Sequence, residues 1–247
     1  MPRFFISAKS GQHFSTQSSY IITGENARHI ARSLRMKMGE SLTLCDGNGL
    51  DAECEITAFT EQDVEVRILS VSQNKTEPET QVHIYQGLPK SDKLETVAQK
   101  ITELGGASIT PVICKRCIAK ADEKSAVKKT VRIQKILLEA AKQSGRGRIP
   151  KANLPMSFKG AMKAAAEKGT VLFFYEAGGK PLSEVLPTAV GEISVFIGPE
   201  GGFAPEEAAY AEEIEAHIVT LGSRILRTET APIAALSVIM YEKGELV

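Results

Sequence analysis

The sequence predicts an α/β domain with a mainly parallel sheet, preceded by a small β-barrel domain. Short strand-like segments with a single helix fill residues 1–72, a polar segment that contains proline occupies residues 73–80, and strands alternate with helices over residues 81–247. Short strands in series are typical of small barrels, whereas regular alternation is typical of a parallel sheet covered by helices. We therefore expect two domains joined by a linker at residues 73–80.

The first domain is predicted from five apolar or alternating runs and one helical pattern. The expected strands are residues 4–6, 20–22, 42–45, 50–59 and 64–71. Asp46-Gly47-Asn48-Gly49 favours a hairpin turn between the third and fourth of them. Thr23 or Gly24 could cap a helix over residues 25–35.

The second domain is predicted from buried-type strands separated by helices. The expected strands are residues 82–86, 109–113, 171–175, 193–197 and 217–221, and the expected helices are residues 92–104, 126–143, 158–168, 205–214 and 232–243. Ser91 is a candidate cap for the helix at residue 92, and Gly105-Gly106 would end it. Pro205 suits the first turn of its helix, where its missing N–H is not needed.

Two glycine-containing loops follow neighbouring strands near the C-terminus. The first is Ile197-Gly198-Pro199-Glu200-Gly201-Gly202-Phe203, and the second runs from Leu221-Gly222 to Thr230-Ala231 and contains Arg227 and Glu229. Loops that leave the same edge of a sheet can form one pocket, and glycine lets backbone approach a ligand closely. The loop at residues 176–179 is a third candidate wall. We predict a ligand site here, with charged groups beside it.

Several common chemistries lack their motifs. No Walker-type phosphate loop, dinucleotide fingerprint, GxSxG or HExxH pattern occurs in the sequence. Cys114 and Cys117 have CxxC spacing, but no second matching pair exists and the first cysteine ends a predicted strand. We therefore expect buried or incidental thiols and no metal.

The composition is that of a globular protein, with 43% hydrophobic and 24% charged residues. No run approaches the ~20 apolar residues that span a bilayer, and the first residues lack a secretory core, so we expect no membrane association and a cytoplasmic location. The net charge is zero, yet residues 115–151 hold twelve lysines and arginines against three acids. Such segregation marks either a nucleic-acid footprint or a solvated helix face.

The ordered set of motifs resembles the RsmE family, which are ribosomal small-subunit RNA uridine-N3 methyltransferases of the SPOUT class. The resemblance rests on both glycine loops and on further short motifs along nearly the whole chain: Arg3-Phe4-Phe5, His29-x4-Leu34-Arg35-x3-Gly39, Lys100-x-x-Glu103-Leu104-Gly105, Pro111 and Gln143-Ser144-x-Arg146. One departure is Lys142, where an acidic residue is expected.

The resemblance implies a PUA-like barrel joined to a SPOUT-type α/β domain with a C-terminal trefoil knot. It also implies S-adenosylmethionine as cofactor, a homodimer, and methylation of N3 of a uridine in 16S ribosomal RNA of the small ribosomal subunit. The expected cofactor residues are Tyr175, Glu176, Ile197, Gly198, Gly201, Gly202, Leu221, Gly222, Leu226, Thr230 and Ala231. Their backbone groups could read the adenine edge and their apolar side chains could cover its faces.

Two charged residues of the second loop are candidates for catalysis. N3 of uracil is protonated at neutral pH, so the site must remove that proton or stabilise the anion. Arg227 could stabilise charge on the uracil carbonyls, and Glu229 could accept the proton. The alternative for both is a structural ion pair that holds the loop closed.

The expected RNA-binding residues are arginines outside the two loops. Arg28, Arg32 and Arg35 would share one helix face, a spacing that can meet phosphates. Arg146 and Arg148 lie in a glycine-containing turn, and Arg3 is a further candidate. Two other functions stay open: a non-catalytic RNA-binding or ribosome-assembly factor on the same scaffold, and a SPOUT methyltransferase with another RNA target.

Overall fold

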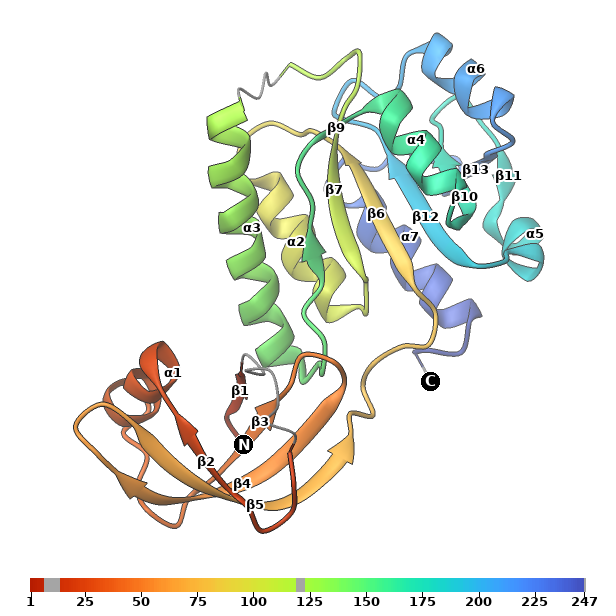
Figure 1. Ribbon diagram of the computed structural model, residues 1–247. Coiled ribbons are helices and arrows are strands. Elements are labelled where there is room, and N and C mark those ends of the chain that lie inside the picture. Colours follow the sequence, from red (N-terminus) through yellow and green to blue (C-terminus); the bar gives the residue numbers. More distant parts are fainter. Residues whose placement is uncertain (7–13, 119–122, 247) are drawn as a thin grey trace. The chain divides into compact units, whose positions relative to one another are not determined.

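The computed structural model describes residues 1–6, 14–118 and 123–246. The chain divides into two compact units (Figure 1). The first contains residues 1–77 and 141–149, and the second contains residues 78–140 and 150–247. The turn with Arg146 and Arg148 therefore belongs to the N-terminal unit, although it lies within the sequence of the other.

The first unit is built on a five-stranded sheet in the order β1-β3-β4-β5-β2. Neighbours β1 and β3 are parallel, and the other pairs are antiparallel. Its strands are β1 (Arg3–Phe5), β2 (Ser19–Ile22), β3 (Ser41–Cys45), β4 (Leu50–Phe59) and β5 (Val64–Gln73). Alternate residues of β4 and β5 point into a core that contains Ile22, Ile30, Leu42, Ile56 and Ile68.

The helix predicted over residues 25–35 is shorter and partly of another type. It consists of α1 (Gly24–Arg28) followed by a π-helical turn, η1 (His29–Ser33). The Leu34 N–H donates to the His29 carbonyl at 2.9 Å, the five-residue step of a π-helix. Arg35 has φ +53° and lies beyond the helix, so the predicted single face does not extend to it.

The second unit contains an eight-stranded sheet. Its order is β11-β13-β10-β12-β6-β7-β8, with β9 also paired to β7, and all these pairs are parallel. The predicted parallel sheet is thus confirmed. The strands are β6 (Val82–Gly87), β7 (Ser108–Ile113), β8 (Lys151–Ala152), β9 (Met156–Ser157), β10 (Gly169–Phe174), β11 (Lys180–Pro181), β12 (Glu192–Ile197) and β13 (His217–Thr220).

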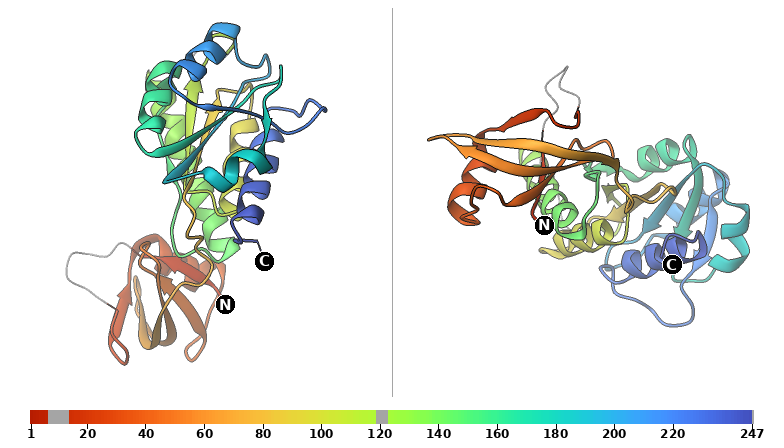
Figure 2. Two further views of the ribbon diagram at one scale, coloured as in Figure 1. Left: turned by 90° about the vertical axis from the view of Figure 1, so that its right-hand side faces the viewer. Right: turned by 90° about the horizontal axis from the view of Figure 1, so that it is seen from below.

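Helices cover both faces of this sheet, which is why every residue of β6 is buried. Helices α4 and α7 lie on opposite sides of it (Figure 2), α4 packs with α6, and α7 packs with α2. On the α4 side an aromatic core includes Tyr85 stacked on Phe196, with ring centroids 4.4 Å apart. The helices are α2 (Lys93–Glu103), α3 (Glu123–Ser144), α4 (Phe158–Ala166), α5 (Leu182–Val185) with the 3-10 turn η2 (Leu186–Thr188), α6 (Pro205–Glu213) and α7 (Ala231–Glu242).

Two predicted helix ends have different outcomes. Ser91 is not the cap of α2, because Asp92 occupies that position and Ser91 itself has φ +56°. Gly105, by contrast, ends the helix as predicted: its φ of +91° is the left-handed conformation that glycine adopts readily.

Candidate functional site

The carboxyl ends of β10, β12 and β13 surround a cavity of about 910 Å³. Three loops form its walls, and these are the two glycine loops and the third wall that the sequence predicts. A cavity of this size at such an edge is the usual ligand position in a parallel sheet. The lining residues include all the predicted cofactor residues except Thr230: Tyr175, Glu176, Ile197, Gly198, Gly201, Gly202, Leu221, Gly222, Leu226 and Ala231.

Glycine is required in the first loop for steric reasons. Gly202 has φ +68°, and a Cβ atom there would collide with the Glu176 carboxylate across the cavity mouth. At Gly87, at the end of β6, a Cβ atom would lie 2.5 Å from the Pro199 nitrogen. At Gly87 the clash is with the backbone of the first loop, so a larger residue there would push the walls apart. At Gly202 the flexible Glu176 side chain can move aside, and the positive φ is what favours glycine.

A buried hydrogen-bond network holds the second loop against the first. The Thr228 hydroxyl donates to the Gly198 carbonyl at 2.7 Å, and the Gln86 side-chain amide donates to the Thr228 oxygen at 2.9 Å. Gln86 is fully buried and Thr228 nearly so. Because β6 supplies Gln86, the two loops are tied to a strand that neither of them follows.

The Lys93 ammonium group lies between carboxylates of the two loops. It is 3.1 Å from Glu200 Oε1 and 3.1 Å from Glu229 Oε2, and Lys93 itself lines the cavity. Burial alone would raise the pKa of Glu200, but N–H groups of its own backbone and of Lys90, together with Lys93, hold it below its usual value. In turn, the hydrogen bonds that Lys93 forms with Glu229 and Glu200 raise the pKa of the lysine.

The Glu229 carboxyl has a pKa below its ordinary value. A hydrogen bond from its own backbone lowers its pKa despite partial burial, and Lys93 and Arg227 lower it further. Efficient bases at neutral pH have raised carboxyl pKa values, so a lowered pKa makes Glu229 a weak proton acceptor. Within the described part of the chain, its ion-pair partner is Lys93.

The Arg227 side chain is more exposed than that of Glu229. This exposed side chain lines the cavity, while the Arg227 backbone carbonyl accepts the N–H groups of Thr230 and Ala231 at 2.8 and 3.0 Å. Those two bonds precede α7, so the start of the helix fixes the Arg227 backbone, and the guanidinium is exposed at the cavity. Thr230 therefore shapes the site through its backbone, and it is not among the residues that line the cavity.

Sequence reasoning missed several residues that build the site. Gln86, Lys93 and Thr228 lie outside the motif glycines, and Arg116 donates to the Gly201 carbonyl at 2.8 Å and lies 3.7 Å from Glu176. One signal could have found Lys93: β6 ends at the same sheet edge as the loops, so a residue that follows this strand can also face the cavity.

The cysteines show thiol chemistry without a metal-binding cluster. Cys114 and Cys117 are free, and a hydrogen bond from Cys114 lowers the pKa of Cys117 to about 7. Among the residues described, no group of three or more His, Cys, Asp or Glu side chains is arranged to hold a metal. None of the helices in those same ranges is long and apolar enough to cross a membrane.

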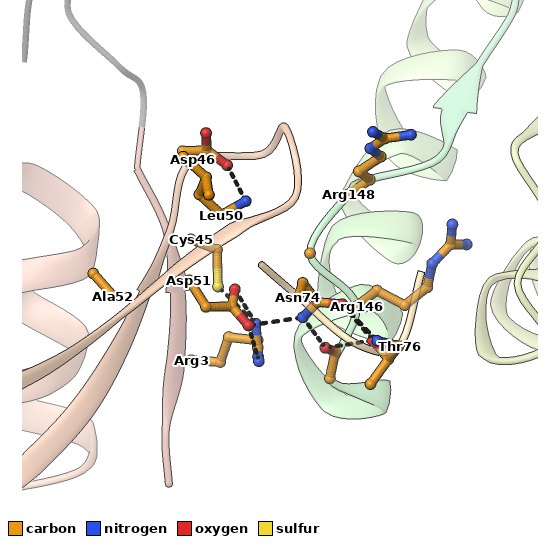
Figure 3. Close-up of polar contacts among 12 residues, drawn as sticks. Arg3, Cys45, Asp46, Leu50, Asp51, Ala52, Asn74, Thr76, Arg146 and Arg148 are labelled. Atoms are coloured by element: carbon orange, nitrogen blue, oxygen red, sulfur yellow. Dashed lines mark hydrogen bonds and ion pairs between the residues drawn. The ribbon is translucent and has the colours of Figure 1, made fainter. Parts of the chain in front are cut away.

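The predicted RNA-binding arginines fall into two groups. Arg3 forms a bidentate pair with Asp51 at 2.7 and 2.8 Å (Figure 3). Arg146, 5% exposed, pairs with Glu77 at 2.9 Å. Burial would raise the pKa of Glu77, but the Arg146 guanidinium and two backbone N–H groups lower it. These two arginines stabilise the unit. Exposed side chains are presented by Arg28, Arg32, Arg35 and Arg148.

Comparisons with known proteins agree with this geometry. Residues 76–240 match the model of an RNA methyltransferase domain, and residues 22–69 match that of an RNA methyltransferase PUA domain. Ribosomal RNA small subunit methyltransferase E of Bacillus subtilis (strain 168) is 35% identical over 98% of this chain and 97% of its own.

Two solved structures are similar over nearly their full length. The ribosomal RNA small subunit methyltransferase E of Neisseria gonorrhoeae bound to S-adenosyl methionine has a TM-score of 0.88 at 30% identity, covering 98% of each chain. A putative methyltransferase of Legionella pneumophila in complex with the bound cofactor SAM has a TM-score of 0.86 at 32% identity, covering 98% of this chain and 97% of that one.

Proposed function

The chain belongs to the ribosomal RNA small subunit methyltransferase E family, and from that membership we propose that it methylates N3 of a uridine in 16S ribosomal RNA. It is an S-adenosylmethionine-dependent ribosomal RNA methyltransferase with a PUA-like and an α/β methyltransferase domain. The observation that carries the proposal is the cavity of about 910 Å³ at the carboxyl edge of the sheet, where three loops converge.

The residues of the cavity fit this cofactor. Backbone at Gly198, Leu221 and Leu226 is accessible to hydrogen-bond the polar edge of adenine, and apolar side chains of the same loops can cover its faces. When bound, S-adenosylmethionine supplies an electrophilic methyl group on a sulfonium. Its adenosyl group carries no phosphate, which agrees with the absence of a phosphate-binding motif from the sequence.

The exposed guanidinium of Arg227 has the main catalytic role in this proposal. As the N3 proton leaves to water, negative charge spreads onto the uracil carbonyls, and a cation at the cavity wall stabilises it. Glu229 keeps the loop in place through Lys93, because its lowered pKa makes it a poor acceptor for that proton. Of the two roles that the sequence leaves open for Glu229, we therefore prefer the structural ion pair to proton acceptance.

RNA binding is assigned to the first unit and its exposed arginines. The proposed domains are residues 1–72 for RNA binding, residues 73–80 as the linker and residues 81–247 for catalysis. The compact units have other bounds, since residues 1–77 cluster with 141–149 and residues 78–140 cluster with 150–247. Arg28, Arg32, Arg35 and Arg148 are the candidates for phosphate contact, whereas Arg3 and Arg146 are committed to ion pairs. A ribosomal substrate supports a cytoplasmic location.

A homodimer and a trefoil knot complete the proposal. Apolar residues occur all round α7, yet Val238 and Tyr241 are 40% and 65% exposed, which supports coverage by a second copy of the chain. The segment between β13 and α7 reaches across β10 and β12, since Thr228 hydrogen-bonds Gln86 in β6. That crossing supports a threaded C-terminus.

The test combines a cellular and a binding measurement. Nucleoside mass spectrometry of 16S RNA from cells without the gene should show loss of one N3-methyluridine, restored by the wild-type gene. Calorimetry with the purified protein should show S-adenosylmethionine binding. Unchanged N3-methyluridine in the deletion strain would refute the proposed base, and a different missing modification would identify the correct one.

A further inference from the structure

Lys93 connects three elements that converge on the cavity. It lies at the start of α2, Glu200 lies in the loop after β12, and Glu229 lies in the loop after β13. The two carboxylate oxygens are both 3.1 Å from the Lys93 nitrogen, so they are separated by no more than twice that distance. Carboxylates this close repel each other unless a cation lies between them.

We propose that Lys93 is a positioning residue for methyl transfer, which holds the Glu200 and Glu229 loops together and so fixes Arg227 at the cavity wall. This inference rests on the proposed function. Glu229 is two residues from Arg227, and the hydrogen bonds of Thr228 and of the start of α7 make this a short, stiff segment, so that a shift of Glu229 is passed on to Arg227. Without the ammonium group, repulsion between Glu200 and Glu229 would move the part of this segment that carries the catalytic guanidinium.

The adenine side of the cavity depends on other contacts. Gly198 is held by the Thr228 hydroxyl, and Gly201 by the Arg116 guanidinium. Neither contact involves Lys93. Loss of Lys93 should therefore change the rate of transfer more than the affinity for the cofactor, since a displacement of about 1 Å in a reacting geometry can cost on the order of 10²-fold in rate.

The first test is the Lys93→Met variant of the full-length protein. Its rate is measured by single-turnover methylation of 16S RNA, and its cofactor affinity by calorimetry. We expect the rate at saturating S-adenosylmethionine to fall at least about tenfold while the cofactor Kd changes less than about threefold. Lys93→Arg should restore most of the rate. The matched control is Lys90→Met, which removes an exposed lysine side chain from the loop before α2. The backbone N–H of residue 90, which contacts Glu200, stays in place.

A second-site variant separates positioning from proton transfer. In Lys93→Met the two carboxylates repel, so adding Glu229→Gln should raise the rate above that of Lys93→Met alone. For the same reason the deficit of Lys93→Met relative to wild type should narrow as pH falls from 7 toward 5, because protonation of one carboxylate, which begins there once the lysine is gone, relieves the repulsion. A fold defect would produce neither the rescue nor the pH dependence.

Three results would overturn the role of Lys93 while leaving the enzyme assignment intact. These are a full rate in Lys93→Met, an equal loss of cofactor affinity and rate, and a double variant slower than both single variants, which would make Glu229 the base. If Lys93→Met does not fold, Lys93→Gln and Glu200→Gln are compared in the same assays. Failure of the proposed function is distinguishable, because the wild-type protein would then lack activity.

Discussion

Arg227 and Glu229 are two residues apart, yet their environments differ. The Arg227 guanidinium is exposed at the cavity, whereas the Glu229 carboxylate is paired with Lys93 and has a lowered pKa. The sequence places both residues in one loop beside the predicted ligand site. The sequence cannot show which of the two is the stronger catalytic candidate, because that depends on Lys93, which is distant in the chain.

Replacing Arg227 with alanine should remove stabilisation of the uracil anion. Loss of one such charge contact lowers turnover by on the order of 10²–10³-fold. Single-turnover methylation at saturating cofactor measures this, with Arg224→Ala as the control because Arg224 also lines the cavity on the same loop. Full turnover in Arg227→Ala would remove Arg227 from the mechanism.

The Glu77–Arg146 pair makes a separate prediction at the residue scale, because both side chains are nearly buried. The pKa of Glu77 is lower in the folded protein than its ordinary value, so its contribution to stability is present at pH values above that ordinary value and is lost as pH falls. Glu77→Gln should therefore cost about 3 kcal/mol at pH 7, since it breaks a buried ion pair.

Urea unfolding of the wild type and of Glu77→Gln between pH 7 and pH 4 checks this. The difference in unfolding free energy between the two proteins should shrink toward acidic pH. Glu55→Gln, which breaks the exposed pair with Arg67, is the control and should cost less than about 1 kcal/mol. A difference that stays constant with pH would show that the Glu77 carboxylate is not the cause.

Among the elements, the π-helical turn differs most from what periodicity predicts. A strict α-helix over residues 25–35 would align Arg28, Arg32 and Arg35, but η1 ends at Ser33 and Arg35 adopts a left-handed conformation. The buried side chains of Ala27 and Ile30 fix which face of the helix is inward, and the wider turn follows from the five-residue hydrogen bond. Such turns are frequent at functional sites.

If this element contacts RNA, its arginines should contribute to the salt dependence of binding. Arg32→Ala should lower the slope of log affinity against log salt by about 0.7–0.9, because one phosphate contact is lost. Fluorescence anisotropy with a 16S RNA fragment over a salt series measures the slope. Arg67→Ala removes an exposed arginine that pairs with Glu55 and should leave it unchanged; equal effects of the two variants would argue for a non-specific charge effect.

For the whole molecule, the exposed apolar side chains of α7 bear on assembly. The helix carries apolar side chains on every side, a pattern typical of a helix that is covered all round. Tyr241→Glu should weaken the proposed homodimer, because it puts a charge into an apolar interface. Analytical ultracentrifugation should then show monomer where the wild type is a dimer. Lys243→Gln, at the C-terminal end of the same helix, changes the net charge by the same amount and is the control. A monomeric wild type would refute the dimer.

Much of this organisation could be predicted from local patterns. The strands over residues 50–59 and 193–197, the parallel sheet and the three loops at its carboxyl edge follow from periodicity and glycine spacing. Short strands such as β8 and β11 could not be found, because two residues carry no period. The cap at Ser91 was wrong because the backbone conformation there depends on the turn before α2.

The sequence by itself determined the two-domain plan, the glycine loops and, through the order of its motifs, the family. Those features depend on residue type and on spacing along the chain. The tertiary structure decided which charged groups are free. It paired Lys93 with Glu200 and Glu229, buried Arg146 on Glu77, and left Arg227 exposed. The physical reason is that an ion pair requires two charges within about 4 Å, and folding, not sequence separation, sets that distance.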